Sequence, residues 1–393
     1  MSTLSVAKRR SAILLVLPLF LFMLAFFLWP LGTVMQQAVS DKSVLGVLPL
    51  TKAAAVDWDG QSLPGPAIEQ AFVSDIRNVD DQQHIGEMVR RLNSASPGFR
   101  TLISKTQASI QTTDGPVDLV SVDKRWAELR YWQTIRDALS PVTDRFLLAS
   151  VDLQRDSLGA IVDMPSDASA NRTIMLRTFG MTATITALCL LLGYPYAVLL
   201  ASVTGWRRNV LLGAVLLPLW TSLLVRTTAW FIVLQDNGIV NRVLMLLHIT
   251  DHPLVLVFNR TGVIIAMTHV LLPLMVLPIY SVLLGIPRNL VPAAGSLGAK
   301  PWRAFIEVTL PLSTRGITSG VLLVFMSAVG YYITPALIGG PKDQMISSVI
   351  AFYATGAANW GMASALGLVL LAITLVLYAV YRRLSTREQE AAE

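Results

Sequence analysis

Residues capable of bond-breaking chemistry are few and form no recognisable catalytic arrangement. The four histidines, His84, His248, His252 and His269, are scattered, and the single cysteine, Cys189, lies inside an apolar run. The chain has neither the glycine-rich phosphate loop of nucleotide-binding proteins nor the His-Glu-x-x-His pattern of zinc hydrolases, and nothing resembles a nucleophile beside its base. We therefore expect no catalytic residue, no metal site and no cofactor, and a conduit rather than an enzyme.

The remaining chemistry belongs to polar and aromatic side chains inside apolar segments. Arg226 lies within an apolar run, where a charge should face protein or water rather than lipid. Trp220, Trp230, Tyr331 and Tyr332 offer aromatic faces, which attract amine cations. Two interpretations stay open for these residues: they line a translocation path, or they serve helix packing and interfacial anchoring.

A second informative segment is residues 292–311, which reads Pro-Ala-Ala-Gly-Ser-Leu-Gly-Ala-Lys-Pro-Trp-Arg-Ala-Phe-Ile-Glu-Val-Thr-Leu-Pro. Pro292 suits the first turn of a helix, and Gly298 permits a sharp backbone turn. A second, amphipathic helix is expected to follow, with four apolar side chains on one side: Trp302, Phe305, Ile306 and Leu310. We expect Pro311 to end it. A short helix–turn–helix of this kind suits a groove in another protein.

The composition of the chain indicates which elements hold these residues. Of 393 residues, 53% are hydrophobic and 14% are charged, whereas an ordinary soluble domain carries about 25% charged residues. This excludes disorder, a coiled coil and a typical cytosolic enzyme. The apolar residues form runs of about 20, the length a helix needs to cross the hydrocarbon of a bilayer. We predict an all-α membrane protein with six transmembrane helices, at about 11–35, 178–203, 210–234, 263–284, 317–337 and 363–381.

The distribution of basic residues predicts the orientation of these helices. The net charge is +6, but its pattern does not suggest nucleic acid as a partner. With the N-terminus inside, the inner segments contain Lys8, Arg9, Arg10, Arg207, Arg208, Arg288, Lys300, Arg303, Arg315, Arg382, Arg383 and Arg387. The short outer loops contain only Arg242, Arg260 and Lys342. Because basic residues concentrate in cytoplasmic loops, both termini are expected in the cytoplasm, with the first span as an uncleaved anchor.

The segment between the first two spans, residues 36–172, is too long for a plain loop. Helical patterns cover 124–139 and 80–92, another begins at Pro141, and 60–66 is typical of a turn. We expect a mainly helical extracytoplasmic domain that packs on the membrane part; the alternative is a poorly ordered insert. The predicted organisation is 1–35 (N-terminus and first span), 36–172 (extracytoplasmic domain), 173–385 (five-helix core with a loop at 290–311) and 386–393 (cytoplasmic tail).

The 292–311 segment resembles the loop by which ABC importer permeases contact their ATPase. That pattern is Glu-Ala-Ala, three residues, Gly, then about a dozen residues and Leu-Pro, and it is matched by Ala293, Ala294, Gly298, Leu310 and Pro311. The Glu position is Pro292, which keeps the helix start but removes a charge. Residues 192–197 resemble the first permease-domain motif. Further segments are similar to the spermidine/putrescine permease subfamily: 218–222, 224–227, 229–230, 237–238 with Asn241, 272–273, 277–280 and 334–340.

This resemblance implies the type I ABC importer permease fold in a bacterial inner (plasma) membrane. It further implies a dimer of ATPase subunits that hydrolyse the ATP, a second permease subunit (a sibling or a copy) and an external solute-binding protein. The implied coupling residues are Ala293, Ala294, Gly298, Trp302, Phe305, Leu310 and Pro311. Candidate residues of the translocation path are Trp220, Arg226, Thr227, Trp230, Tyr331, Tyr332 and Thr334.

The identity of the solute stays open. The subfamily implies a polyamine, yet no Asp or Glu lies deep in any predicted span, and a cation crossing the bilayer would be expected to find carboxylates nearby. A sibling permease could supply them; an opine, an amino acid or a phosphonate are alternatives. Two other classes are a membrane-anchored receptor with a ligand-binding outer domain and an ATP-independent carrier, which inverted repeats or paired acids would favour.

Overall fold

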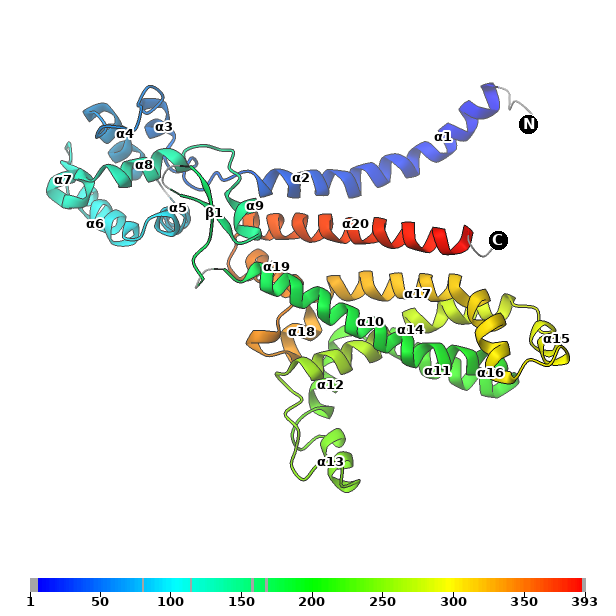
Figure 1. The fold of residues 1–393 in the computed structure, drawn as a ribbon. Coiled ribbons are helices and arrows are strands. Elements are labelled where there is room, and N and C mark those ends of the chain that lie inside the picture. Colours follow the sequence, from blue (N-terminus) through cyan, green and yellow to red (C-terminus); the bar gives the residue numbers. More distant parts are fainter. Residues whose placement is uncertain (1–5, 80, 114, 157–158, 167–168, 391–393) are drawn as a thin grey trace. The chain divides into compact units, whose positions relative to one another are not determined.

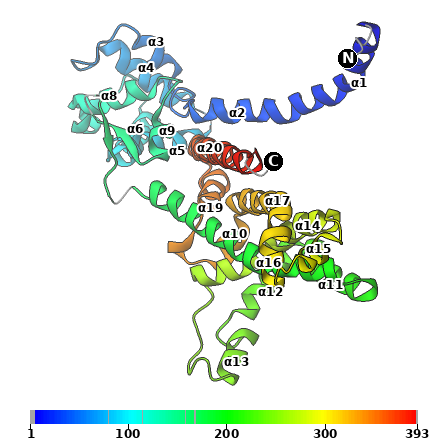
Figure 2. The same ribbon diagram turned by 45° about the vertical axis from the view of Figure 1, so that its right-hand side comes forward.

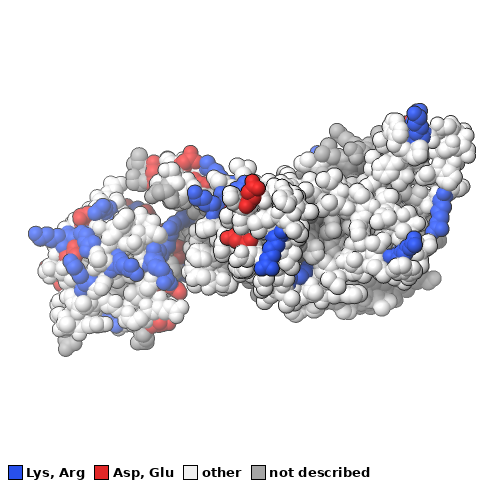
Figure 3. All heavy atoms as spheres, turned by 90° about the horizontal axis from the view of Figure 1, so that it is seen from below, with Lys and Arg blue, Asp and Glu red and all other residues white. Residues whose placement is uncertain are grey.

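The computed structural model describes residues 6–390 except 80, 114, 157–158 and 167–168; for 6–14 and 384–390 it describes the backbone alone. The chain divides into two compact units, with the division between Leu148 and Ala149. Figure 1 and Figure 2 show the helices of both units. In the view of Figure 3, charged side chains are dense over the short helices of the first unit, whereas the surface of the second unit is mostly uncharged, as expected for membrane helices.

The first unit begins with a long apolar helix. It consists of α1 (Val6–Met23), a π-helical turn η1 (Leu24–Leu28) and α2 (Trp29–Ala38). Leu15–Ala38 is apolar enough to cross a membrane, with a mean hydropathy of 2.3, in agreement with the first predicted span. In the π turn the Trp29 N–H bonds the Leu24 carbonyl, five residues back, directly before Pro30. Because proline has no N–H and crowds the preceding turn, a wider turn lets the helix continue.

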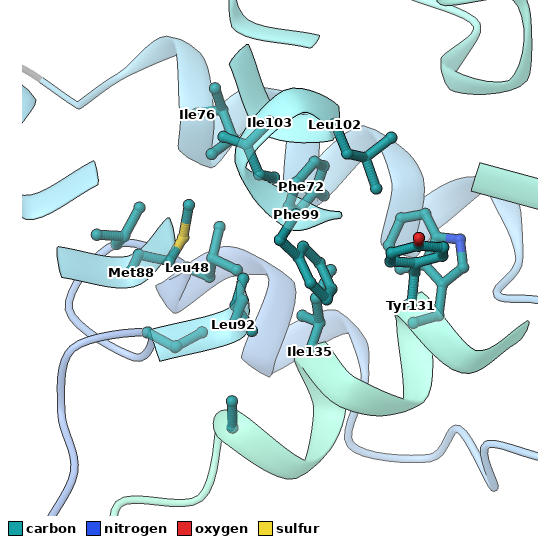
Figure 4. Close-up of a cluster of buried hydrophobic side chains, with 14 of the residues drawn as sticks. Leu48, Phe72, Ile76, Met88, Leu92, Phe99, Leu102, Ile103, Tyr131 and Ile135 are labelled. Atoms are coloured by element: carbon teal, nitrogen blue, oxygen red, sulfur yellow. The ribbon is translucent and has the colours of Figure 1, made fainter. Parts of the chain in front are cut away.

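Short helices around one apolar core make up the rest of the first unit; we call residues 39–148 the helical domain. They are α3 (Pro49–Ala54), α4 (Pro66–Arg77), α5 (Gln82–Ala95), α6 (Phe99–Thr112), α7 (Leu119–Val122), the 3-10 turn η2 (Lys124–Ala127), α8 (Leu129–Ala138) and the start of α9 (Arg145–Ser150). Most of these helices contribute side chains to the core (Figure 4), including Phe72, Leu92, Phe99 and Tyr131, and Leu48 joins them from the position before α3. The prediction of a mainly helical segment here is confirmed.

Aromatic rings form the centre of this core. Phe72, Trp126 and Trp132 meet with ring centroids 4.9–5.6 Å apart. The Trp126 Nε1 donates to Thr106 Oγ1 and the Trp132 Nε1 donates to the Trp126 carbonyl, both at 2.9 Å. Each buried indole therefore has a partner for its only polar group, and its burial carries no desolvation penalty from an unpaired donor.

The predicted helix over 124–139 is two helices rather than one. It breaks at Glu128, whose backbone is extended. The short turn η2 before this break is capped by Asp123, whose carboxylate accepts the Arg125 N–H. Trp126 and Trp132 are nevertheless both buried. The helix predicted over 80–92 is α5, capped by Asp81; its expected first residue, Asp80, lies outside the described residues. The helix expected from Pro141 begins only at Arg145.

The second unit opens with the hairpin β1 (Leu153–Arg155) and β2 (Ile161–Asp163), in which Gln154 pairs with Val162. The helices that follow are α10 (Asn171–Ser202), α11 (Gly205–Trp220), α12 (Leu223–Val233), α13 (Ile239–Leu246), α14 (Arg260–Gly285), α15 (Leu290–Ser296), α16 (Pro301–Ala304), the π turn η3 (Phe305–Thr309), α17 (Leu310–Gly330), α18 (Ile333–Ile338), η4 (Pro341–Asp343), α19 (Ile346–Ala351), η5 (Phe352–Gly356) and α20 (Trp360–Glu390).

The core of this unit is built around α14, which packs against both α10 and α17 (Figure 2). Small residues allow the close approach. A Cβ atom added to Gly316 would lie 2.8 Å from the Cα of Ile279, and one added to Gly320 would lie 3.0 Å from the Met275 carbonyl oxygen. The glycine pair four residues apart therefore serves packing within the chain, one of two roles its spacing allows.

The spans differ from the prediction in three places. The third predicted span, 210–234, is two helices, α11 and α12, whose axes differ by 103°. The break follows Pro218 and is stabilised by Ser222, whose Oγ accepts the Val225 N–H at 3.3 Å. The fifth predicted span, 317–337, breaks after Gly330, before α18. Five helices are long and apolar enough to span a membrane among the described residues, or six if the bent pair counts as one.

The third difference concerns Pro311, which does not end a helix. The chain is helical without interruption from Pro301 to Gly330. As before Pro30, a π turn precedes the proline: the Leu310 N–H bonds the Phe305 carbonyl, five residues back. The wider turn accommodates the missing amide hydrogen of Pro311. The second helix of the 292–311 segment is therefore the first part of a membrane-spanning helix.

Candidate functional site

Two groups of predicted site residues occupy separate parts of the second unit, and the first is the turn at Gly298. This residue has φ = 86°, a left-handed conformation that costs other residues energy. Its N–H donates to the Gly295 carbonyl at 2.9 Å, and the Ala299 N–H donates to the Ala294 carbonyl at 3.0 Å. These are the two bonds of a Schellman motif, in which a left-handed residue closes the end of a helix. The predicted sharp turn is thus the C-terminal cap of α15.

The turn projects apolar side chains that the chain does not cover. Leu297 is 90% exposed and Trp302 is 63% exposed, and Ile306 and Val291 are also exposed. Ala293 and Ala294 lie on α15, the first of them exposed, and Phe305 and Pro311 are exposed on the helix that follows. Exposed apolar residues gathered in one segment mark a surface that contacts another protein or lipid. We call residues 290–311 the elbow.

The base of the elbow is tied to the helix core. The Tyr194 hydroxyl of α10 lies 2.9 Å from Ser313 Oγ on α17. Since the Ser313 proton goes to the Leu310 carbonyl at 2.9 Å, Tyr194 is the donor. The ring of Tyr194 also meets that of Phe305 edge to face, with centroids 5.8 Å apart. Tyr194 of α10 therefore holds the start of the second elbow helix in place through one hydrogen bond and one ring contact.

Charges on the elbow and just before it are mostly positive. Arg288, Lys300 and Arg303 are exposed, and residues 286–306 contain no Asp or Glu. Glu307 pairs with Arg303 one turn away, at 2.8 Å. Pro292 occupies the position where the family pattern has Glu. A partner of the elbow therefore meets an apolar surface with a basic rim.

The second group surrounds the bend between α11 and α12. Thr227 on α12 and Thr334 on α18 are fully buried, and their hydroxyl oxygens lie 3.1 Å apart. The Thr227 proton goes to the Leu223 carbonyl at 3.0 Å, so Thr334 donates to Thr227. Two predicted path residues that are 107 positions apart in sequence thus form a direct contact between short helices.

Arg226 and Trp230, one turn apart on α12, line a cavity of about 240 Å³. His269 of α14 also lines it, and its Nδ1 accepts a hydrogen bond from Trp230 Nε1 at 3.1 Å. The rest of the wall is mainly apolar: Leu217, Pro218, Thr221, Val225, Ala229 and Val233. The Nε of Arg226 is buried and has no hydrogen-bond partner among the described residues.

The remaining path candidates do not line this cavity. Trp220 ends α11 with its side chain 77% exposed. Tyr331 and Tyr332 form the break between α17 and α18, where Ser347 Oγ donates to the Tyr331 carbonyl at 2.6 Å and Ser348 Oγ donates to the Tyr332 carbonyl at 3.2 Å. The backbone carbonyls of Tyr331 and Tyr332 therefore help to fix the conformation of the break between α17 and α18.

Sequence reasoning did not select His269. It was counted among scattered histidines and assessed only as a metal ligand. His269 lies in the middle of an apolar span, nearly forty residues after Trp230, so no short sequence motif connects the two residues. The signal that could have found it is the general one that a polar ring inside a span needs a partner.

Long apolar helices packed around α14, with an exposed elbow between two of them, define a membrane-embedded transport subunit. Residues 163–389 match the family described as binding-protein-dependent transport system inner membrane component, and the chain belongs to that family. It is therefore a multi-pass inner membrane permease of the ABC importer fold, from a family of transport proteins rather than catalytic enzymes. Residues 1–162, which include the helical domain, lie outside the match.

Individual relatives agree with this assignment. Over 212 residues the chain is 34% identical to the spermidine/putrescine transport system permease protein PotB of Escherichia coli (strain K12), covering 54% of this chain and 77% of that protein. Over 229 residues it is 30% identical to the inner membrane ABC transporter permease protein YdcU of the same organism, covering 55% and 72%. The predicted similarity to ABC importer permeases, and to the spermidine/putrescine subfamily, is confirmed.

Among solved structures, the chain is similar to one of a bacterial ABC transporter involved in the import of the acidic polysaccharide alginate. The TM-score is 0.42 at 21% sequence identity, and the alignment covers 54% of this chain and 79% of that one.

Proposed function

We propose that this protein is a transmembrane subunit of an ATP-driven importer and that the elbow docks on the ATPase. The observation that supports this is the elbow itself: a capped helix and turn that expose Leu297 and Trp302 while Tyr194 holds their base. A groove in a partner that covers these two side chains would remove from water the most exposed apolar surface of the segment.

The geometry suggests how movement of the elbow reaches the membrane. Because helix continues from Pro301 to Gly330, displacement of its first turns also moves α17 as a whole. Closure of two ATPase subunits on ATP would push the elbow and switch the helices from inward-open to outward-open. ATP binding drives the change because it favours one of the two conformations over the other.

The full assembly in this proposal contains two ATPase subunits, a second permease subunit and an external solute-binding protein. One permease chain does not enclose a path by itself, so the second subunit forms the other wall. Both termini and the elbow face the cytoplasm, as the distribution of basic residues predicts. The helical domain then lies outside, where we propose that it contacts the binding protein or covers the outer mouth of the path.

The solute in this proposal is a small organic molecule, and a polyamine is the first candidate because PotB is named as a spermidine/putrescine permease. Trp230 beside the cavity offers an aromatic face to an amine. An opine, an amino acid or a phosphonate remain alternatives. A membrane-anchored receptor with a ligand-binding outer domain is the alternative from another class of protein.

Co-purification tests the proposal directly. We expect the tagged protein, expressed with its partner subunits, to retain the ATPase in stoichiometric amount. Leu297→Glu and Trp302→Glu should each lower ATPase retention and ATP-dependent uptake at least tenfold, because a carboxylate would be buried in an apolar groove. Val56→Glu, which changes an equally exposed apolar residue of the helical domain, is the matched control. Unchanged ATPase retention in both elbow variants would refute docking through the elbow.

A further inference from the structure

The connection between α12 and α14 exposes many apolar side chains for its length. The large apolar residues that it leaves exposed are Ile239, Val243, Leu246, Leu247, Ile249, Leu254, Val255 and Phe258. The helical domain is several times longer, yet its described residues expose only Leu50, Val56, Leu63, Val120 and Val142. So large an apolar patch is unfavourable in water, and its presence indicates that something other than water covers it.

On α13 the exposed residues form one face. Ile239, Val243 and Leu246 follow one another at spacings of four and three, so they lie along one side of the helix, and Leu246 is 76% exposed. Asn241 on the opposite side is fully buried. Its side chain accepts the Leu254 N–H at 2.8 Å and donates to the Leu254 carbonyl at 3.0 Å. These bonds hold α13 against its own loop and leave the apolar face free.

The bend between α11 and α12 turns this connection sideways. α11 packs against α14, and the 103° bend sends α12 across the bundle rather than out of it. In Figure 1 and Figure 2, α13 stands to the side of α10, α14 and α17, and in Figure 1 it does not pass beyond their ends. The connection therefore runs beside the membrane helices instead of leaving them for water.

The C-terminal end of α13 satisfies its backbone groups within the segment. His248 has φ = 54°; its N–H donates to the Met245 carbonyl and the Ile249 N–H donates to the Leu244 carbonyl, both at 3.0 Å. These are the two bonds of a Schellman motif. Internal pairing of this kind is what a helix end needs among acyl chains, where no water replaces a missing partner.

The residue types on the free face favour lipid over another protein. Helices that pack on one another in membranes use small residues, as Gly316 and Gly320 do where α17 meets α14. The free face of α13 consists of Ile, Val and Leu. Arg242, one turn from Ile239, is exposed at its edge, where a long basic side chain can reach the headgroups.

We propose that α13 is embedded in the leaflet opposite the elbow, with its free face among the acyl chains. The leaflet follows from the topology: α14 is a span, α13 precedes it and the elbow follows it. In this position α13 anchors α12, with Arg226 and Trp230, at a fixed depth in the bilayer. The proposal requires a chain that spans the membrane and does not depend on the ATPase.

The first test measures what surrounds α13 in the purified protein, with the subunits it retains, in lipid nanodiscs. Cys189→Ala removes the native thiol, and a nitroxide on Leu246→Cys or Ile239→Cys reports from the free face. Oxygen concentrates among acyl chains, whereas a nickel complex stays in water. We expect severalfold more collisions with oxygen than with the nickel complex at both positions, and the reverse for Val56→Cys, an exposed apolar position of the helical domain.

The second test asks whether another protein covers the free face in intact cells. Benzoylphenylalanine in place of Leu246, activated by light, should form adducts with radiolabelled phospholipid and give no cross-linked protein band. The same photoreactive residue in place of Leu297 is the positive control for a protein contact, because the elbow is proposed to dock on the ATPase.

Two results would overturn the proposal. Equal access of the nickel complex to Leu246→Cys and Val56→Cys would place α13 in water. Few collisions with either reagent, together with a protein cross-link from position 246, would show that a second permease or the binding protein covers the face. Absence of a cross-link from position 297 would instead count against docking of the elbow.

Discussion

Replacement of Gly298 by alanine tests the elbow without touching any other side chain. Gly298 has φ = 86°, and a Cβ atom placed on it would have no heavy atom within 4 Å. The substitution therefore acts on backbone conformation alone. An L-residue in the left-handed region costs about 1–2 kcal/mol relative to glycine, and a seven-residue helix such as α15 has little stability of its own to absorb it.

That cost converts into a measurable loss of docking. About 1–2 kcal/mol is a factor of about 5–30 in the population of the capped turn, and the apparent Kd for the ATPase rises as the competent fraction falls. We expect Gly298→Ala to weaken ATPase retention by up to this factor. Gly298→Asn should be milder, because asparagine adopts the left-handed conformation more readily.

Titration of the purified permease complex with its ATPase, together with ATP-dependent uptake in vesicles, gives the assay. Gly295→Ala is the matched control, because Gly295 is helical and also has open space at Cβ; alanine there should leave docking unchanged or strengthen it, by up to about 1 kcal/mol of helix stability. Equal affinities for Gly298→Ala, Gly298→Asn and the original protein would refute the role of this turn.

Three further substitutions test other parts of the fold. Gly316→Val should lower the melting temperature of the purified complex because its Cβ would meet the α14 backbone at 2.8 Å, whereas Gly180→Val, with open space at Cβ, should not. Trp126→Ala should destabilise the helical domain by about 3–5 kcal/mol, measured as faster proteolysis of residues 39–148; unchanged proteolysis would contradict its place in the core. The third substitution is Asp123→Asn. The pKa of the Asp123 carboxyl lies below its ordinary value of 3.8, mainly because Arg125 donates a hydrogen bond to it. The stabilisation that the ionised Asp123 carboxylate gives the fold is therefore present above that pH and lost as pH falls through the lowered pKa. The difference in unfolding midpoint between Asp123→Asn and the original protein should therefore shrink in acid.

The sequence allowed prediction of the spans because their signal is cumulative. Twenty apolar residues in succession identify a membrane helix whatever their order, and α10, α14 and α20 lie where the hydropathy places them. Breaks inside apolar runs have no such signal. Ser222 caps α12 with one hydrogen bond, and the helices on both sides of it are apolar, so hydropathy does not reveal the 103° bend between α11 and α12.

Part of the candidate site could be predicted and part could not, for a similar reason. Gly298 was predictable, since a glycine seven residues into a helix-like segment suggests a left-handed cap. The cavity at Arg226 was not, because its wall depends on which face of α12 meets α14. The Trp230–His269 contact joins residues 39 positions apart. The residues next to His269 in the sequence do not distinguish it from the other histidines.

Pro311 shows that a local rule can fail in a way that matters for mechanism. Proline predicts the end of a helix, but the π turn from Phe305 to Thr309 carries the helix through it. If the helix ended there, movement of the elbow could be absorbed by a hinge before reaching the membrane. As a continuous element to Gly330 it has no such hinge, and α18 follows it after two residues, carrying the Thr334 that bonds Thr227 beside Arg226. In the proposed importer the elbow and the cavity wall are therefore linked through one long helix, the break at Tyr331 and Tyr332, α18, and the hydrogen bond from Thr334 to Thr227. Thr334→Val, which removes that bond while keeping the side-chain shape, should weaken the dependence of uptake on ATP without reducing ATPase retention; an unchanged rate of uptake at every ATP concentration would show that the connection runs elsewhere.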